Sequence, residues 1–423
     1  MGLRFVHTGD LHLDSPFLGI GQAAPERVVS ALRDATLRSW DRIVSLALDA
    51  EVDAVLVAGD VFEGANHTLR AQVAFRDGLE RLARRQIPSF IVTGNHDPLS
   101  GWEPAIALPE LAYRFGAAEV GSRSILRDGV EIARVHGISY AVRDVTRNLA
   151  ATFKRDGDEP YAIGLLHANV GGIEGYGNYA PCSISDLAAS GMDYWALGHI
   201  HKHGILRAAD PTVVYCGNPQ GRDPGETDPR GCYLVTVDDL GRAYPEFRPM
   251  DVVRWQRLNV PIEPIATEEA LIEAVGGAVE AAVDSAGRSV VAIVTLTGRS
   301  PVHAALRRTG FLADLHEEVR QRFGAGEPFA WLESIRDATR PTIDTTARRE
   351  AGDLLGEALR EFNRSRAALR EGQEADLHDL LAELYNHPRA RRALTGARLD
   401  SARLLALLDA AESLVIDQLD SPD

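Results

Sequence analysis

Apolar runs that end in polar residues alternate with stretches of helical periodicity in the first part of the chain. The runs at 3–10, 53–60 and 87–97 read as buried strands that stop at Asp, Asn or His. The segments at 31–51 and 70–86 carry apolar residues at helical spacing. Strands that alternate with helices predict a largely parallel, layered α/β core. In such folds ligands bind at the carboxyl ends of the strands, so function is expected at these polar ends.

Two later apolar runs, at 161–170 and 192–204, continue the pattern, and both reach histidine. The second contains "ALGHIHKHG", in which His199, His201 and His203 alternate. Alternate residues of an extended segment lie on one side of the chain. Such a row of imidazoles is either a polar surface turn or part of a metal site, and this motif by itself does not decide between them.

The composition of the chain shifts near residue 250, which predicts a division into three parts. We expect a first domain over 1–250, a smaller α/β domain over 251–340 and a helical region over 345–423. The last region contains three segments with apolar stripes at helical spacing, at 352–369, 375–387 and 400–419.

The overall composition is that of an ordinary globular protein. The 423 residues suffice for two or three domains, and hydrophobic residues make up 45%. No stretch approaches the ~20 apolar residues of a membrane span, and the N-terminus lacks the apolar region of a signal peptide. We therefore expect a cytoplasmic protein with no membrane contact. The net charge of −16 argues against a surface built for non-specific nucleic-acid binding. It does not exclude a nucleic-acid substrate, because bound metals supply positive potential locally.

Potential metal ligands stand at five separate strand ends. They are Asp10 and His12, then Asp60, then Asn95, His96 and Asp97, then His167, and finally His199 and His201. A dinuclear site requires a bridging carboxylate, several imidazoles and an open face for water and phosphate, with the metals ~3.5–4 Å apart. Mixed Asp, His and Asn ligation suits manganese, iron or zinc better than magnesium.

The motifs D-x-H, GD, GNHD, a strand-ending His and GH-x-H occur here in this order. Together they resemble the calcineurin-like metallophosphoesterase superfamily. The segments "FVHTGDLHLDSPF", "VAGDVF", "DYWALGHIHKHGIL" and "VYCGNPQGRDPGETDPRGCYLV" are similar to the SbcD-like DNA repair exonucleases, and most similar to their YhaO-type branch. The likeness is close over about 1–250 and only architectural beyond.

The resemblance implies a role for each of these residues. Asp10, His12 and His201 would bind a first metal; Asn95, His167 and His199 would bind a second; Asp60 would bridge both. His96 would act near the phosphate, as transition-state stabiliser or as general acid to the leaving oxygen. Asp97 follows it and would orient its imidazole.

The resemblance also implies the fold, the reaction and the partners. The fold is α/β: a layered α/β/β/α metallophosphoesterase sandwich with a small α/β capping domain and a helical C-terminal region. The reaction is hydrolysis of DNA phosphodiesters in DNA repair by an exonuclease, with endonuclease activity left open, and with two divalent metal ions, expected to be Mn²⁺. The expected partners are DNA, an SbcC-like coiled-coil ATPase docked through the C-terminal helices, and a second copy of the chain.

Several alternatives remain open from the sequence. The same metal site would also serve a phosphodiesterase or phosphatase for small nucleotides, or survive in a non-catalytic partner of such an ATPase. His203 is either a rim residue or a phosphate contact, and the loop at 169–181 either stacks on bases or is a surface loop. Arg222 and Arg230 are either phosphate contacts or solvated. Glu63 stands where the family often has Asp or His, close to the expected metals.

Overall fold

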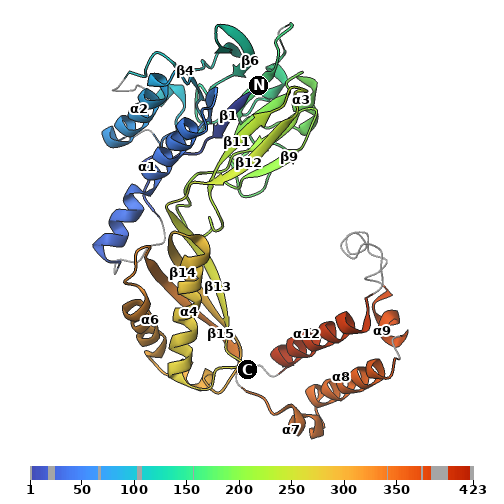
Figure 1. Cartoon of the computed structure of the whole chain (residues 1–423). Coiled ribbons are helices and arrows are strands. Elements are labelled where there is room, and N and C mark those ends of the chain that lie inside the picture. Colours follow the sequence, from blue (N-terminus) through green and yellow to red (C-terminus); the bar gives the residue numbers. More distant parts are fainter. Residues whose placement is uncertain are drawn as a thin grey trace. The chain divides into compact units, whose positions relative to one another are not determined.

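The structure is a computed structural model, shown in Figure 1. It describes residues 2–17, 24–64, 68–101, 107–155, 157–340, 342–372, 375–382 and 399–419. The chain forms two compact units. The first contains residues 1–260, 272–295 and 312–336; the second contains residues 261–271, 296–311 and 337–423. Both units take segments from the region between 250 and 340, so the domain boundaries expected there stay predictions.

The first sheet of the first unit carries the strands expected from the first three apolar runs. Its order is β12 (Ala243–Pro249), β11 (Gly231–Val237), β1 (Arg4–Thr8), β2 (Ala54–Ala58), β3 (Ser89–Val92) and β4 (Ala112–Arg114). The strands β1 to β4 run parallel, and β11 joins β1 antiparallel. Because β1 to β3 are parallel, their carboxyl ends meet at one edge of the sheet.

Alternate side chains of these strands pack into two different hydrophobic cores. Val55 and Val57 of β2 pack under the helices α1 (Glu26–Asp49) and α2 (Leu69–Arg84), in a cluster that includes Trp40 and Phe75. Ala54, Leu56 and Ala58 of the same strand point the other way, into the cluster between the two sheets. Strands buried on both faces explain why these runs are apolar throughout.

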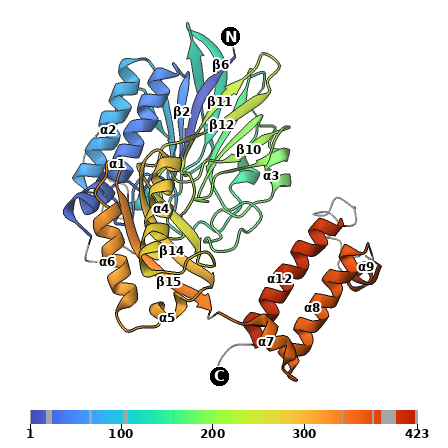
Figure 2. The ribbon, with the colours of Figure 1, turned by 60° about the horizontal axis from the view of Figure 1, so that its bottom comes forward.

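The second sheet lies on the far side of that inner core. Its order is β5 (Gly121–Arg127), β6 (Val130–Gly137), β7 (Ala162–His167), β8 (Tyr194–Gly198), β10 (Thr212–Tyr215) and β9 (Gly204–Arg207). Its outer face packs against α3 (Ile184–Ala189) and the short helix η2 (Ala150–Thr152), with Trp195 and Leu187 in the cluster. A further short helix, η1 (Leu99–Gly101), follows β3. Figure 2 shows the two sheets between their helices. The predicted α/β/β/α sandwich is therefore confirmed.

The sequence pattern missed the hairpin formed by β5 and β6. Its turn is Asp128–Gly129, both with positive φ (52° and 78°), which is the local signature of a tight hairpin turn. The two strands lie at the end of the sheet and are largely half-exposed, so they lack the continuous apolar run of the central strands.

The remainder of the chain has the expected smaller sheet and C-terminal helices. The third sheet has the order β13 (Val253–Pro261), β14 (Ser289–Arg299) and β15 (Ala330–Arg340). The helix α4 (Glu268–Ala286) connects its first two strands along the chain; α5 (His303–Leu306) and α6 (Phe311–Phe323) connect the last two. The final helices are α7 (Thr345–Glu350), α8 (Leu354–Arg370), α9 (Ala375–Leu380) and α12 (Ser401–Leu419).

The helices α8 and α12 lie side by side in both views (Figures 1 and 2). Leu369 packs with Leu404 and Leu408, and Leu359 packs with Ile416, so part of their apolar stripes is used within this helical unit. Residues 383–387 of the second predicted helical segment lie outside the described residues. Among the described helices, none combines the length and hydropathy that a membrane crossing requires.

Candidate metal centre

All of the predicted site residues follow or end the strands β1, β2, β3, β7 and β8. Those fully buried are Asp10, His12, Asp60, Asn95, Asp97, His167 and His199, while His96 and His201 are partly exposed. Glycines make this packing possible. A Cβ on Gly94 would lie 2.3 Å from Asp60 Oδ1, and one on Gly198 would lie 2.0 Å from the carbonyl oxygen of Ala58.

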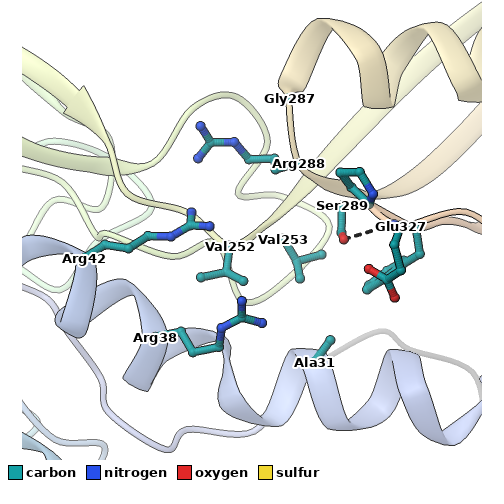
Figure 3. A pocket seen from close by; sticks show the side chains of 11 residues that line it. Ala31, Arg38, Arg42, Val252, Val253, Gly287, Arg288, Ser289 and Glu327 are labelled. Atoms are coloured by element: carbon teal, nitrogen blue, oxygen red, sulfur yellow. Dashed lines mark hydrogen bonds between the residues drawn. The ribbon is translucent and has the colours of Figure 1, made fainter.

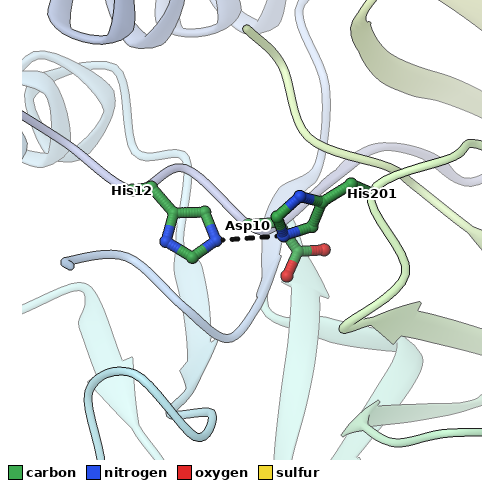
Figure 4. A group of neighbouring side chains, drawn as sticks. All are labelled: Asp10, His12 and His201. Carbon is green, nitrogen blue, oxygen red and sulfur yellow. Dashed lines mark hydrogen bonds between the residues drawn. The ribbon is translucent and has the colours of Figure 1, made fainter. Parts of the chain in front are cut away.

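The first group of potential ligands contains Asp10, His12 and His201, whose ligand atoms lie within 4.8 Å of one another. Figure 4 shows the rings of His12 and His201 pointing toward one another beside Asp10. Their Nε2 atoms are 3.2 Å apart. Two imidazole nitrogens and a carboxylate that converge in this way fit a shared divalent cation.

The second group contains Asp10, Asp60 and His167. His167 Nε2 lies 3.4 Å from Asp60 Oδ2 and 3.1 Å from Asn95 Oδ1. The same Asp60 Oδ2 is 3.9 Å from His12 Nε2, so this one oxygen lies between the two groups. The other oxygen, Oδ1, accepts a hydrogen bond from the backbone N–H of His96 (2.9 Å), which fixes the carboxylate in this orientation.

His199 lies beside the second group, with its ring 5.1 Å from that of His167. Its Nε2 donates to the carbonyl oxygen of Gly177 (2.7 Å), so Nδ1 carries the lone pair of the neutral ring. Its backbone N–H donates to both oxygens of Asp10. Its role as a ligand stays a prediction.

Burial sets the protonation of these groups. It lowers the pKa of His12 to about 3 and that of His199 to about 4, so both rings are neutral at pH 7 and keep a lone pair. Burial also raises the pKa of Asp10, to about 6, against the opposing effect of His167. Burial disfavours the charge on Asp60, but His167 outweighs it and holds the pKa of that carboxyl below its usual range. Burial disfavours the imidazolium of His167, but Asp60 outweighs it and raises the pKa of His167 to about 9. This ring therefore carries the positive charge beside the buried carboxylates that bound divalent cations would supply instead.

Two further carboxylates that the sequence did not single out for these roles hold the imidazoles. Glu226 Oε1 lies 2.5 Å from His201 Nδ1, and Glu226 Oε2 accepts from the backbone N–H of Arg222 (2.7 Å). A metal-ligating histidine usually donates its second N–H to such a group, and that rule would have directed the search to acids in this loop. His167 Nδ1 donates instead to the carbonyl oxygen of Ala58 (2.9 Å).

Glu63 is the second of these carboxylates, and it contacts the imidazoles of both His12 and His96. Its Oε2 is 2.8 Å from His12 Nδ1 and 2.6 Å from Arg222 Nη1, and its Oε1 is 2.8 Å from His96 Nδ1. Burial disfavours the imidazolium of His96, but Glu63 outweighs it and raises the pKa of His96. The sequence located Glu63 near the metals; the structure adds that it contacts two site imidazoles.

The expected role of Asp97 requires a correction. Its Oδ1 accepts from the backbone N–H of Gly94 (2.8 Å), and its Oδ2 accepts from that of Val61 (2.7 Å). The carboxylate thus joins the loops that follow β2 and β3, and the group that contacts His96 is Glu63. The reason is local geometry: Asp97 turns back into the loop, while His96 faces outward.

The remaining sequence candidates lie beside the two groups or outside them, and their roles stay predictions. The ring of His203 stacks on Phe247, 3.6 Å away, outside both groups. Arg222 pairs with Glu63, and Arg230 donates to the carbonyl oxygen of His201 (2.5 Å). In the loop at 169–181, the ring of Tyr176 lies 5.9 Å from those of both His199 and His201. The loop therefore lies against the candidate metal centre.

Comparisons with known proteins agree with this class of site. A family described as calcineurin-like phosphoesterase matches residues 3–203, and one described as metallophosphoesterase YhaO, middle domain, matches residues 255–340. The fold and these matches define a calcineurin-like metallophosphoesterase, a class of hydrolases that act on phosphoester bonds.

Individual relatives narrow the assignment. The chain is 35% identical over 391 residues to the uncharacterized metallophosphoesterase YhaO of Bacillus subtilis, covering 92% of each protein. It is 31% identical over 264 residues to the DNA double-strand break repair protein Mre11 of Haloferax volcanii, covering 59% of this chain and 54% of Mre11. It is 24% identical over 257 residues to a component of the nuclease SbcCD of B. subtilis, covering 51% of this chain and 61% of that component. The chain belongs to the YhaO family of metallophosphoesterases.

Proposed function

We propose that this chain is a dinuclear, metal-dependent phosphodiester hydrolase that acts on DNA in repair, as an exonuclease and also an endonuclease. The observation that carries the proposal is the position of Asp60 Oδ2 between His12 Nε2 and His167 Nε2, at the edge where five strand ends meet. Similarity to Mre11 and to the component of the nuclease SbcCD supports DNA as the substrate.

The residues of the candidate metal centre would have different roles in this reaction. Asp10, His12 and His201 would hold one ion, and Asn95, His167 and His199 the other, with Asp60 shared. When bound, two divalent ions, expected to be Mn²⁺, would supply a nucleophilic hydroxide at neutral pH and neutralise charge on the phosphoryl oxygens. His96 keeps its Nδ1 on Glu63, so its Nε2 is available to donate a proton to the leaving oxygen.

The test is hydrolysis of end-labelled linear duplex DNA with manganese, with magnesium or with chelator, beside an Asp60→Ala variant. Shortening that requires both manganese and Asp60 supports the proposal, and the label reveals the polarity. Turnover of cyclic or linear mononucleotides with intact DNA would instead favour a phosphodiesterase for small nucleotides. Full metal loading with no hydrolysis of any phosphodiester would favour a non-catalytic partner.

We also propose that the C-terminal helices dock an SbcC-like coiled-coil ATPase and that the protein forms a homodimer. Leu354 of α8 and Leu407 and Leu414 of α12 stay 67%, 44% and 58% exposed, so apolar surface remains after these helices have packed on each other. The expected result is that a chain ending near residue 345 loses capture of the ATPase but keeps metal-dependent hydrolysis. Equal capture by the full and shortened chains would contradict the docking proposal, and light scattering tests the dimer.

A further inference from the structure

A second concave site lies in the first compact unit, apart from the residues of the candidate metal centre. It is a pocket of about 380 Å³. Its walls come from α1, from the segment that enters β13, from the start of β14 and from the residues before β15 (Figure 3). Its floor is formed by Val252 and Val253, which belong to an apolar cluster with Val28 and Leu32 of α1.

Three arginines surround this pocket: Arg38 and Arg42 from α1, and Arg288 from the residue before β14. Figure 3 shows their three guanidinium groups on one side of the view, with Ser289 and Glu327 on the other. Their clustering is unusual in a chain whose net charge is −16. Like charges held together in a partly buried site repel one another, so such a cluster implies an anion that offsets the repulsion.

Two of the arginines are fixed by backbone contacts and keep free donors. Arg42 Nη1 donates to the carbonyl oxygen of Asp251 (2.6 Å), and Arg288 Nη1 donates to the same carbonyl (2.5 Å) and to the Asp251 carboxylate (2.6 Å). Arg38 makes no hydrogen bond or ion pair with any residue that the structure describes. Preorganised guanidinium groups with unused N–H donors are what planar recognition of a phosphate requires.

The acidic groups nearby do not balance this charge. The carboxylate of Asp251 is already shared, because Arg254 contacts both of its oxygens at 2.7 and 3.0 Å. Burial lowers the pKa of Arg42, and the neighbouring Arg38 lowers it further. Glu327 lies at the exposed rim of the pocket and has no ion pair with a described residue.

The pocket is also connected to the loop that supports the candidate metal centre. Gln220 accepts from the backbone N–H of Val252 (2.7 Å) and donates to the carbonyl oxygen of Val253 (2.6 Å). The same loop continues to Arg222 and Glu226, which contact Glu63 and His201. Hydrogen bonds therefore link the floor of the pocket to the loop that contacts His201.

We propose that Arg38, Arg42 and Arg288 form a binding site for a phosphate group that is separate from the metal centre. The phosphate comes either from a nucleic-acid strand or from a small phosphorylated molecule such as a nucleotide. This inference does not depend on the proposed hydrolysis, because it concerns binding by residues outside the metal ligands.

The test measures binding to the full chain in chelator, where the metal centre binds no phosphate through metals. One probe is inorganic pyrophosphate, measured by calorimetry, and the other is a fluorescein-labelled DNA duplex, measured by polarisation. The variant is Arg38→Ala, and its matched control is Arg33→Ala, another exposed arginine of α1 that does not line the pocket. Glu327→Gln should change the affinity in the opposite direction, toward tighter binding, because it removes the negative charge at the rim of the pocket.

We expect Arg38→Ala to weaken binding of at least one probe about tenfold, the cost of one charge-assisted contact. Arg33→Ala should leave it near the wild-type value, and Glu327→Gln should tighten it about twofold. Loss for pyrophosphate without loss for DNA assigns a small phosphorylated ligand, and loss for DNA, with a smaller salt dependence, assigns a strand phosphate. Equal binding by the Arg38→Ala and Arg33→Ala variants for both probes would overturn the proposal.

Discussion

Replacing Glu63 tests how the candidate metal centre is held together. Its carboxylate contacts His12, a predicted metal ligand, and His96, the predicted proton donor, at 2.8 Å each. Charge-assisted contacts of this kind contribute about 1.5–3 kcal/mol when buried, but the Glu63 side chain is 34% exposed, so solvent weakens them. We therefore expect Glu63→Gln to raise the activation free energy by about 1.4 kcal/mol, which is a tenfold loss of kcat/KM. Glu63→Ala should lower kcat/KM by up to about a hundredfold.

The assay is manganese-dependent hydrolysis of a small chromogenic phosphodiester, which reports on the centre without contributions from DNA binding. Metal affinity is titrated in parallel, because loss of support for His12 should weaken metal binding while loss of support for His96 should lower kcat at saturating metal. Glu51→Gln is the control, since the Glu51 side chain is 81% exposed and lies outside the site. In a His96→Ala background the kcat effect of Glu63→Gln should largely vanish. Wild-type kcat/KM and metal affinity in both Glu63 variants would refute the reasoning.

Three further substitutions test the supporting structure. Glu226→Gln should weaken metal binding about tenfold, because it removes the carboxylate charge that faces Nδ1 of His201, as a metal titration would show. Asp97→Asn should lower the free energy of unfolding by about 1–3 kcal/mol, because an amide cannot accept from both loops, and thermal unfolding checks this. Burial lowers the pKa of His7 from 6.5 to about 3, so the neutral ring is stable above pH 6.5 and its contribution falls as the pH drops. Between pH 7 and pH 5 the free energy of unfolding should therefore fall by about 2 kcal/mol because of His7. In the His7→Asn variant this contribution should be absent when the free energy of unfolding is measured with denaturant.

The strand ends could be predicted because local sequence determines them. Each central strand is buried on both faces, so its apolar run stops where the sheet stops, and the next polar residue lies at the edge. The backbone at the first two strand ends is held by contacts between their loops. Asp10, His12 and Asp60 have φ of 47°, 41° and 49°, and the N–H groups of Asp10 and His12 donate to the carbonyl oxygens of Gly59 and Asp60. These bonds hold the first two strand ends together in a strained conformation.

The supporting contacts could not be predicted, because each joins residues that are far apart in the chain. Arg222 is 159 residues from the carboxylate that it contacts, Glu63, and no local pattern encodes that pairing. His96 and Asp97 show the limit most sharply, since the same GNHD motif directs one side chain outward and the other back into the loop. A motif specifies which residue types stand at a strand end, whereas the direction of each side chain depends on which backbone N–H groups the neighbouring loop leaves free. In this chain the backbone N–H of Val61, in the loop after β2, donates to the carboxylate of Asp97. The carboxylate that contacts His96 is therefore that of Glu63.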